Sequence, residues 1–228
     1  MEEGRGSSED LLQAQKAYWD EQQPSVDGML GGLGFVHDTD IAGSRAFLDK
    51  VMPLREGQQD RGRALDCGGG IGRVTKHLLL PAGFTSVDIL DVSSDFLDKA
   101  VDYVGSDALK NRFCSGLSQF DFAGTGLKWN CVWVQWCAIY LADDAFVDFF
   151  RRAAAALADE NSLVVLKENA LRGDRPPEPD HDDSSVTRSD SHMRRLFERA
   201  GLRVVHAEEQ KGFPAELYPV ISYALVPR

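Results

Sequence analysis

A glycine-rich stretch in the first half of the chain carries the residues whose types and spacing most clearly indicate chemistry. Asp66 ends a short apolar run, Gly68, Gly70 and Gly72 follow it, and an amphipathic segment begins at Arg73. Glycine permits the positive φ angles of a tight turn and the close approach of a ligand to the backbone. The backbone N–H groups of a helix N-terminus then face that ligand. The pattern predicts a strand, a loop and a helix that bind a nucleotide-like cofactor.

The form of this loop narrows the choice of cofactor. Its spacing is G-x-G-x-G, because Arg73 and Thr75 stand where the third glycine of a dinucleotide fingerprint would fall, and no P-loop motif occurs. Asp91 lies at the predicted end of the second strand, where a carboxylate accepts hydrogen bonds from ribose hydroxyls. Its simpler alternative role is to cap the helix that begins at Ser94. Together these features favour S-adenosylmethionine over NAD or ATP.

Other polar residues are placed to contact the same ligand. Arg73 opposes the helix dipole in a first turn, which indicates a local partner such as a ligand carboxylate, unless the side chain is simply exposed. Gln135 ends the fourth predicted strand within an apolar run, where a buried amide needs partners that a ligand can provide. Leu117 and Ser118 follow the third predicted strand, where an adenine ring would be covered.

Alternating strands and helices must position these groups. Such alternation predicts a parallel sheet covered by helices on both faces, and the last two strands, with no helix between them, predict an antiparallel hairpin. The expected class is α/β, with a Rossmann-like, mostly parallel sheet of seven strands and an N-terminal helical extension. Strands are expected at 63–66, 86–90, 112–114, 131–136, 163–167, 203–207 and 218–226, and helices at 11–21, 40–52, 94–104, 143–157 and 187–200.

The chain divides into a short tail and one domain. Residues 1–9 are polar, which predicts disorder, and residues 10–228 form the single domain, with a helical cap over 10–56 and the Rossmann-like core over 63–228. The net charge of −11 argues against affinity for nucleic acid or anionic membranes. The four cysteines show no zinc-binding spacing, so no metal is expected. No apolar N-terminal segment suggests secretion, and the expected location is the cytoplasm and the nucleus.

Several segments, in matching order, resemble the protein α-N-terminal methyltransferases, enzymes that use S-adenosylmethionine to methylate proteins beginning X-Pro-Lys. The resemblance implies a class I methyltransferase sheet and protein substrates with a free N-terminus. The segments are Tyr18-Trp19, Val26-Asp-Gly-Met-Leu-Gly-Gly32, Leu65-Asp-Cys-Gly-Gly-Gly-Ile-Gly-Arg73, Val134-Gln-Trp136, Lys167-Glu-Asn169 and Asp183-Ser-Ser185. The cofactor residues that it implies, to which the loop glycine Gly70 is added, are Gly68, Arg73, Asp91, Val92, Ser93, Leu117, Ser118 and Gln135.

The acceptor amine needs a group to receive its proton. Asn169 directly follows the fifth predicted strand, where its amide oxygen would orient the amine. The resemblance assigns the catalytic aspartate to Asp183 and a second base to the position of Tyr140, where the family has histidine. Tyrosine has a reference pKa near 10 and is no base at neutral pH. We therefore expect Tyr140 to hydrogen-bond the amine or relay a proton to water, and Asp183 to carry most of the catalysis.

The substrate groove is expected between two tryptophans and an acidic loop, which carries Asp180, Asp182 and Asp183. Trp19 and Trp136 would box the first residues of the peptide, although both would equally suit an ordinary core. Leu30 would form a wall among mobile glycines, and Asp180 would meet the substrate lysine, although the loop could also be merely solvated. The remaining substrate-binding candidates are Ser185, Glu216, Leu217 and Tyr218.

Two other functions share these features. One is a small-molecule amine methyltransferase on the same fold, and the other is a cofactor-binding interaction subunit without catalysis, which the tyrosine at position 140 would suit. A monomer is expected in each case.

Overall fold

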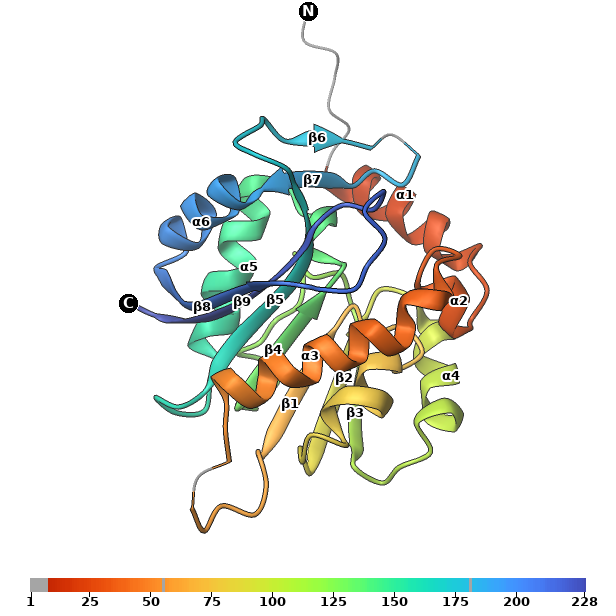
Figure 1. Cartoon of the computed structure of the whole chain (residues 1–228). Helices are drawn as coiled ribbons and strands as arrows, with labels where there is room; N and C mark the ends of the chain where they lie inside the picture. The colour runs from red at the N-terminus through yellow and green to blue at the C-terminus, as the bar shows by residue number, and fades with distance from the viewer. Residues whose placement is uncertain (1–7, 55, 181) are drawn as a thin grey trace, which may run out of the picture.

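The computed structural model describes residues 8–54, 56–180 and 182–228 (Figure 1). Its helices are α1 (Ser8–Asp20), α2 (Val26–Met29), α3 (His37–Val51), α4 (Ser94–Val104), α5 (Asp143–Ala155) and α6 (Asp190–Arg199). Its strands are β1 (Arg63–Cys67), β2 (Ser86–Asp91), β3 (Leu109–Cys114), β4 (Cys131–Gln135), β5 (Leu163–Leu171), β6 (Glu178–Pro179), β7 (Val186–Ser189), β8 (Leu202–Glu209) and β9 (Val220–Pro227).

The sheet confirms the mostly parallel prediction. Strands β3, β2, β1, β4 and β5 are parallel neighbours, β9 pairs antiparallel with β5, and β8 pairs antiparallel with β9. The seven predicted strands therefore form one continuous sheet, in which the last strand lies between the fifth and the sixth. Two short strands, β6 and β7, were not predicted and extend the sheet beside the end of β5.

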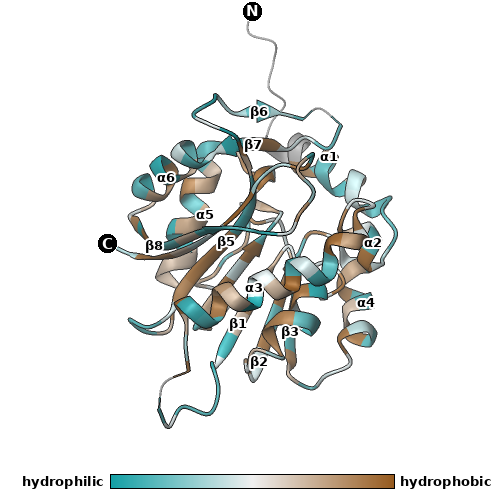
Figure 2. Ribbon diagram, in the orientation of Figure 1, coloured by the Kyte–Doolittle hydropathy of each residue, from teal (hydrophilic) through white to brown (hydrophobic). Residues whose placement is uncertain are grey.

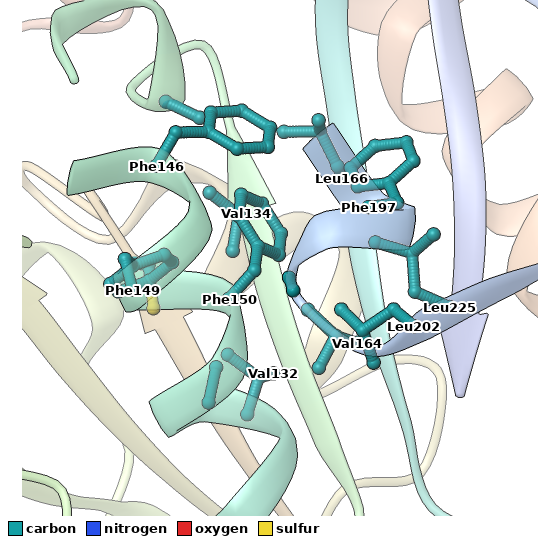
Figure 3. Packing of buried hydrophobic residues seen from close by; sticks show 14 of the residues in the cluster. Val132, Val134, Phe146, Phe149, Phe150, Val164, Leu166, Phe197, Leu202 and Leu225 are labelled. Carbon is teal, nitrogen blue, oxygen red and sulfur yellow. The ribbon is translucent and has the colours of Figure 1, made fainter. Parts of the chain in front are cut away.

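Alternation of side chains along the central strands separates two apolar layers. On β4, Val132 and Val134 pack with the phenylalanines of α5 and α6, as Figure 3 shows from close by. Cys131 and Trp133 point to the other face and pack with residues of α3 such as Phe47. Successive residues of a strand face opposite sides, so a fully apolar strand fits a sheet covered on both faces, and the brown central strands of Figure 2 show this.

Several helix boundaries differ from those predicted. The helical segment after the glycine loop begins at Arg73 as predicted, but it continues as a short π-helix over Thr75–Leu79. The last helix begins at Asp190 instead of residue 187, because the preceding residues pair as β7 and Ser189 caps the helix through its side chain. Helix α1 already begins at Ser8, so two residues of the expected tail are helical, while residues 1–7 lie outside the described part.

The helix predicted over 40–52 begins earlier, because α3 starts at His37. Asp40 therefore lies inside the helix, in its first turns, and its side chain is fully buried. No helix within the described ranges is both long and apolar enough to cross a membrane. The same ranges contain no group of side chains arranged to hold a metal ion.

Candidate cofactor and acceptor site

A pocket lies at the carboxyl ends of the parallel strands, the edge where ligands bind in open α/β sheets. The glycine loop, the ends of β2 and β4, the loop after β3 and helix α1 all contribute to its wall. Of the predicted site residues, the pocket brings together Trp19, Gly68, Gly70, Arg73, Asp91, Val92, Leu117, Ser118, Gln135, Trp136 and Tyr140.

The glycine loop adopts a conformation that requires glycine. Gly68 and Gly70 have φ angles of 63° and 53°, in the left-handed region where a side chain is strained. A Cβ atom on Gly70 would lie 2.5 Å from the sulfur of Met29, and one on Gly68 would lie 2.5 Å from the Cβ of Cys137. The loop therefore presents bare backbone to the pocket.

Asp66 anchors this loop through hydrogen bonds to Thr75. Its Oδ2 accepts hydrogen bonds from the backbone N–H and the hydroxyl of Thr75, at 3.0 and 2.7 Å. Burial raises the pKa of Asp66 to about 6, against the effect of these donors. The acid before the glycines is thus a structural anchor for the loop.

Asp91 is held at the end of β2 by backbone donors. Its Oδ2 accepts from the N–H of Gly70 at 2.8 Å, and its Oδ1 accepts from the N–H of Ser93 at 2.9 Å. A carboxylate has further lone pairs, so Asp91 can still receive a ribose hydroxyl. Burial raises its pKa. Ser93 does not line the pocket within the described residues, and its hydroxyl donates to Asp20 of α1 at 2.9 Å.

Asp40 joins three polar residues beneath the pocket. Its carboxylate accepts from Arg73 Nη1 at 2.8 Å and from Gln135 Nε2 at 2.9 Å, and it pairs with Lys167 Nζ at 2.6 Å. The partner of Arg73 predicted from the sequence is therefore a protein carboxylate, and the Gln135 amide, whose oxygen accepts from Trp133, is satisfied without a ligand.

The charges of this network are balanced only in part. Burial acts to raise the pKa of Asp40, but Lys167 and Arg73 hold it below its usual range. Burial lowers the pKa of Lys167, and its ammonium is surrounded by Asp40, the hydroxyl of Ser44 and the amide oxygen of Gln210. With one carboxylate between two cations, the wall of the pocket at Arg73 favours an anion.

Arg73 retains donors for such an anion. Only its Nη1 has partners in the described part of the chain, Asp40 and the ring of His37. No fully buried side-chain nitrogen or oxygen lacks a partner there, so Nε and Nη2 are accessible from the pocket that Arg73 lines. S-adenosylmethionine fits this arrangement, because its amino-acid carboxylate would lie beside Arg73 and its ribose at Asp91, with bare backbone between them.

The acceptor side of the pocket is built around a hydrogen bond between two segments. The hydroxyl of Tyr140 donates to Asp183 Oδ2 at 3.0 Å, and Asp183 Oδ1 accepts from the N–H of Ser185 at 2.9 Å. Burial, reinforced by Asp183, raises the pKa of Tyr140 far above its usual value, so Tyr140 stays protonated. The ring of Trp19 packs edge-on against Tyr140, with 6.1 Å between centroids. Trp136 lies with its ring 5.6 Å from the guanidinium of Arg73.

The other predicted substrate residues lie outside the pocket wall as far as the described residues define it. Leu30 is buried, and its neighbour Met29 lines the pocket instead. Asn169 is half-buried near the end of β5, and Tyr218 is exposed just before β9. Asp180 is exposed after β6, and Ser185 is buried beside Asp183. Glu216 and Leu217 lie in the loop before β9. His181, next to Asp180 in the sequence, lies outside the described residues.

Sequence reasoning missed several residues of the site. Leu12, Gln15 and Met29 line the pocket from the N-terminal extension, and Asp40 organises its base. The only signal for Asp40 was an acid on the apolar side of a helix. The signal for the others was weaker, because the docking of α1 and α2 on the core is not encoded in a local pattern.

Glu168 is a further missed residue, and it is buried beside the segment that ends at Tyr140. Alternation along β5 sends Lys167 toward α3 and Glu168 to the opposite face. There its carboxyl accepts from the N–H of Ile139 at 3.3 Å, in the 3₁₀ helix Ala138–Tyr140, and from its neighbour's N–H at 3.0 Å. Burial raises the pKa of Glu168 to about 8 despite these donors. The carboxyl is therefore mainly protonated at neutral pH.

This pKa predicts a pH dependence of stability. An unfolded Glu168 titrates near 4.5 and the folded one near 8, so the folded state binds the extra proton between these values and loses stability as the pH rises. Glu168→Gln removes this titrating group. Between about pH 5 and about pH 8, the free energy of unfolding of the variant should therefore fall by on the order of 4 kcal/mol less than that of the wild type. Urea unfolding at both pH values measures the difference, and parallel losses in the two proteins would contradict it.

The strand order, the antiparallel β9 and the pocket at the sheet edge define a class I S-adenosylmethionine-dependent methyltransferase. The family model described as AdoMet-dependent proline di-methyltransferase matches residues 7–226, and the chain belongs to that family. Among its relatives, N-terminal Xaa-Pro-Lys N-methyltransferase 1 of Danio rerio is 44% identical, over 91% of this chain and 92% of the relative. The Homo sapiens protein of the same name is 41% identical, over 92% of each chain.

A solved structure agrees with this assignment. A SAM-dependent methyltransferase from Leishmania major superposes with a TM-score of 0.84 and 36% identity, over 94% of this chain and 82% of that one. The fold and the family expected from the sequence are confirmed.

Proposed function

We propose that this chain methylates the free α-amino group of proteins that begin X-Pro-Lys, with S-adenosylmethionine as methyl donor. The observation that carries the proposal is the Tyr140–Asp183 hydrogen bond, because it places a carboxylate beside the pocket that fits the cofactor. The relatives named as Xaa-Pro-Lys N-methyltransferases support the substrate class.

The cofactor would be held by groups already described. Arg73 would receive its carboxylate, Asp91 its ribose, and Leu117 and Ser118 would cover its adenine, with the bare backbone at Gly68 and Gly70 next to it; all of these residues line the pocket. When bound, S-adenosylmethionine supplies an electrophilic methyl group on a sulfonium. Methyl transfer is an in-line displacement, so the protein contributes mainly by positioning the amine.

The protein's own task is to present the amine without its proton. An α-amine has a pKa of about 7.7–8.0, so deprotonation at neutral pH costs only about 1 kcal/mol. An Asp183 carboxylate oxygen accepts this proton, while the Tyr140 hydroxyl donates to the same carboxylate and offers its own oxygen lone pairs to the amine. Since Tyr140 keeps its proton, Asp183 is the base, and the amide oxygen of Asn169 orients the amine.

The remaining residues would bind the substrate peptide. Trp19 and Trp136 flank the first residues, and Leu30 supports the wall behind them. Asp180 receives the substrate lysine at the mouth, where a carboxylate and an ammonium attract each other. The proposed groove is completed by Ser185, Glu216, Leu217 and Tyr218. We propose that the enzyme acts as a monomer in the cytoplasm and the nucleus.

A peptide panel tests this function directly. A peptide beginning Ser-Pro-Lys should gain up to three methyl groups by mass spectrometry, and one beginning Pro-Pro-Lys up to two, because a proline nitrogen accepts fewer. The same peptide with an acetylated N-terminus should gain none, since the amide nitrogen has no basic lone pair. Absence of methylation on every free X-Pro-Lys peptide, with cofactor binding verified by calorimetry, would exclude the proposal.

A further inference from the structure

Helix α1 places a buried amide side chain at the pocket. Gln15 is 6% exposed and lines the pocket together with Leu12 and Trp19 of the same helix. Figure 1 shows α1 at the same end of the molecule as β7, near the carboxyl ends of the strands. A buried amide is retained where its hydrogen bonds are satisfied, so its partners indicate its role.

Gln15 bridges two segments that are far apart in the sequence. Its Nε2 donates to the carbonyl oxygen of Tyr140 at 3.0 Å and to that of Ser184 at 3.3 Å. Only the NH₂ end of an amide can donate to two carbonyl oxygens, so the chemistry fixes which end faces the two segments.

The two bridged segments are those that form the acceptor side. Tyr140 ends the 3₁₀ helix, and Ser184 follows Asp183 with a φ of 62°, a conformation that costs energy in a residue with a side chain. Such a conformation persists where several contacts hold it. The bond from Gln15 is one of these contacts, and the N–H of Ser185 on Asp183 is another.

We propose that Gln15 is a positioning residue for methyl transfer: by bridging the Tyr140 and Ser184 carbonyls, it holds the Tyr140 hydroxyl and the Asp183 carboxylate at hydrogen-bond distance. The inference rests on the proposed function, in which that carboxylate takes the proton of the amine. It also makes the N-terminal helix part of the acceptor side, so the Rossmann-like core alone does not complete the site.

Gln15→Met tests the proposal, because methionine keeps the length and burial of the side chain but cannot donate. We expect kcat on an X-Pro-Lys peptide to fall about tenfold or more, as misplacement of reacting groups does. The Kd for the cofactor should stay the same, because the hydrogen bonds of the Gln15 amide go to Tyr140 and Ser184 and not to Arg73, Asp91 or the glycine loop. Gln13→Met is the matched control, because Gln13 is an exposed glutamine on the same helix, and it should behave as wild type.

A double-mutant cycle separates positioning from general support of the fold. In a Tyr140→Phe background, where the hydroxyl is already lost, Gln15→Met should lower kcat much less than in the wild type. Equal losses in both backgrounds, a wild-type kcat, or a parallel loss of cofactor affinity would overturn the proposal.

Hydrogen exchange keeps this test independent of the substrate assignment. Without any peptide, Gln15→Met should accelerate amide exchange at residues 183–186 relative to Gln13→Met, because the Ser184 segment loses its anchor. Unchanged exchange would overturn the proposal. A wild-type enzyme inactive on the peptide panel, with accelerated exchange in the variant, would instead exclude the proposed function while supporting the bridge.

Discussion

Asp183→Asn is expected to lower kcat on an X-Pro-Lys peptide by about 10²–10⁴-fold, the range that general acid–base catalysis contributes. Asparagine has nearly the same shape and can still accept the hydrogen bond from Tyr140, which is 3.0 Å from the carboxylate in the wild type. It cannot take up a proton at neutral pH. Because Asp183 does not line the cofactor pocket within the described residues, the Kd for the cofactor should stay the same. Steady-state kinetics and calorimetry measure the two quantities.

The neighbouring acid supplies the control for this substitution. Asp182 is exposed and differs from Asp183 in having no hydrogen bond to Tyr140. Asp182→Asn should therefore keep kcat within about twofold of wild type, as surface substitutions do. A similar small effect of Asp183→Asn would show that another group removes the proton, and would remove Asp183 from the mechanism.

Asp40→Asn should have the largest effect on stability and cofactor binding together. The substitution removes the only carboxylate paired with two buried cations, Lys167 at 2.6 Å and Arg73 at 2.8 Å, among the described residues. Breaking a buried ion pair costs about 3–5 kcal/mol, which for a chain of this size lowers Tm by roughly 10 °C. The Kd for the cofactor should rise as well, because Arg73 and Gln135 lose the group that orients them.

Asp38→Asn on the same helix is the control for this loss, because Asp38 is exposed and forms no ion pair in the described structure. Thermal unfolding of both variants with and without cofactor measures the two effects. Lys167 and Arg73 lower the pKa of Asp40, although burial acts to raise it. The stability that the ionised Asp40 contributes is therefore present above its unfolded pKa near 3.8 and is lost as the pH falls through the folded pKa. Asp40→Asn should thus approach wild-type stability only in acid. A wild-type Tm and cofactor Kd at neutral pH would contradict the role of Asp40.

The sequence by itself determined the sheet and the cofactor loop. Apolar runs such as 131–135 fit a strand that is buried on both faces, as in a covered parallel sheet, and the glycines permit the left-handed turn seen at Gly68 and Gly70. Both signals are local, because they depend on side-chain period and on the absence of a Cβ atom. The pairing of the last two strands also follows from local order along the chain.

The tertiary structure alone decided the partners of the polar residues. Arg73 lacks a local partner in the sequence, and its contact with Asp40 depends on how α3 docks on the sheet. The Gln15 bridge likewise joins segments more than a hundred residues apart. The Tyr140–Asp183 bond joins segments several tens of residues apart. A hydrogen bond between such distant groups has no period or spacing in the chain, because its geometry is set by the packing of whole elements. The sequence therefore determines which chemistry is available, and the docking of α1 and α3 determines where it acts.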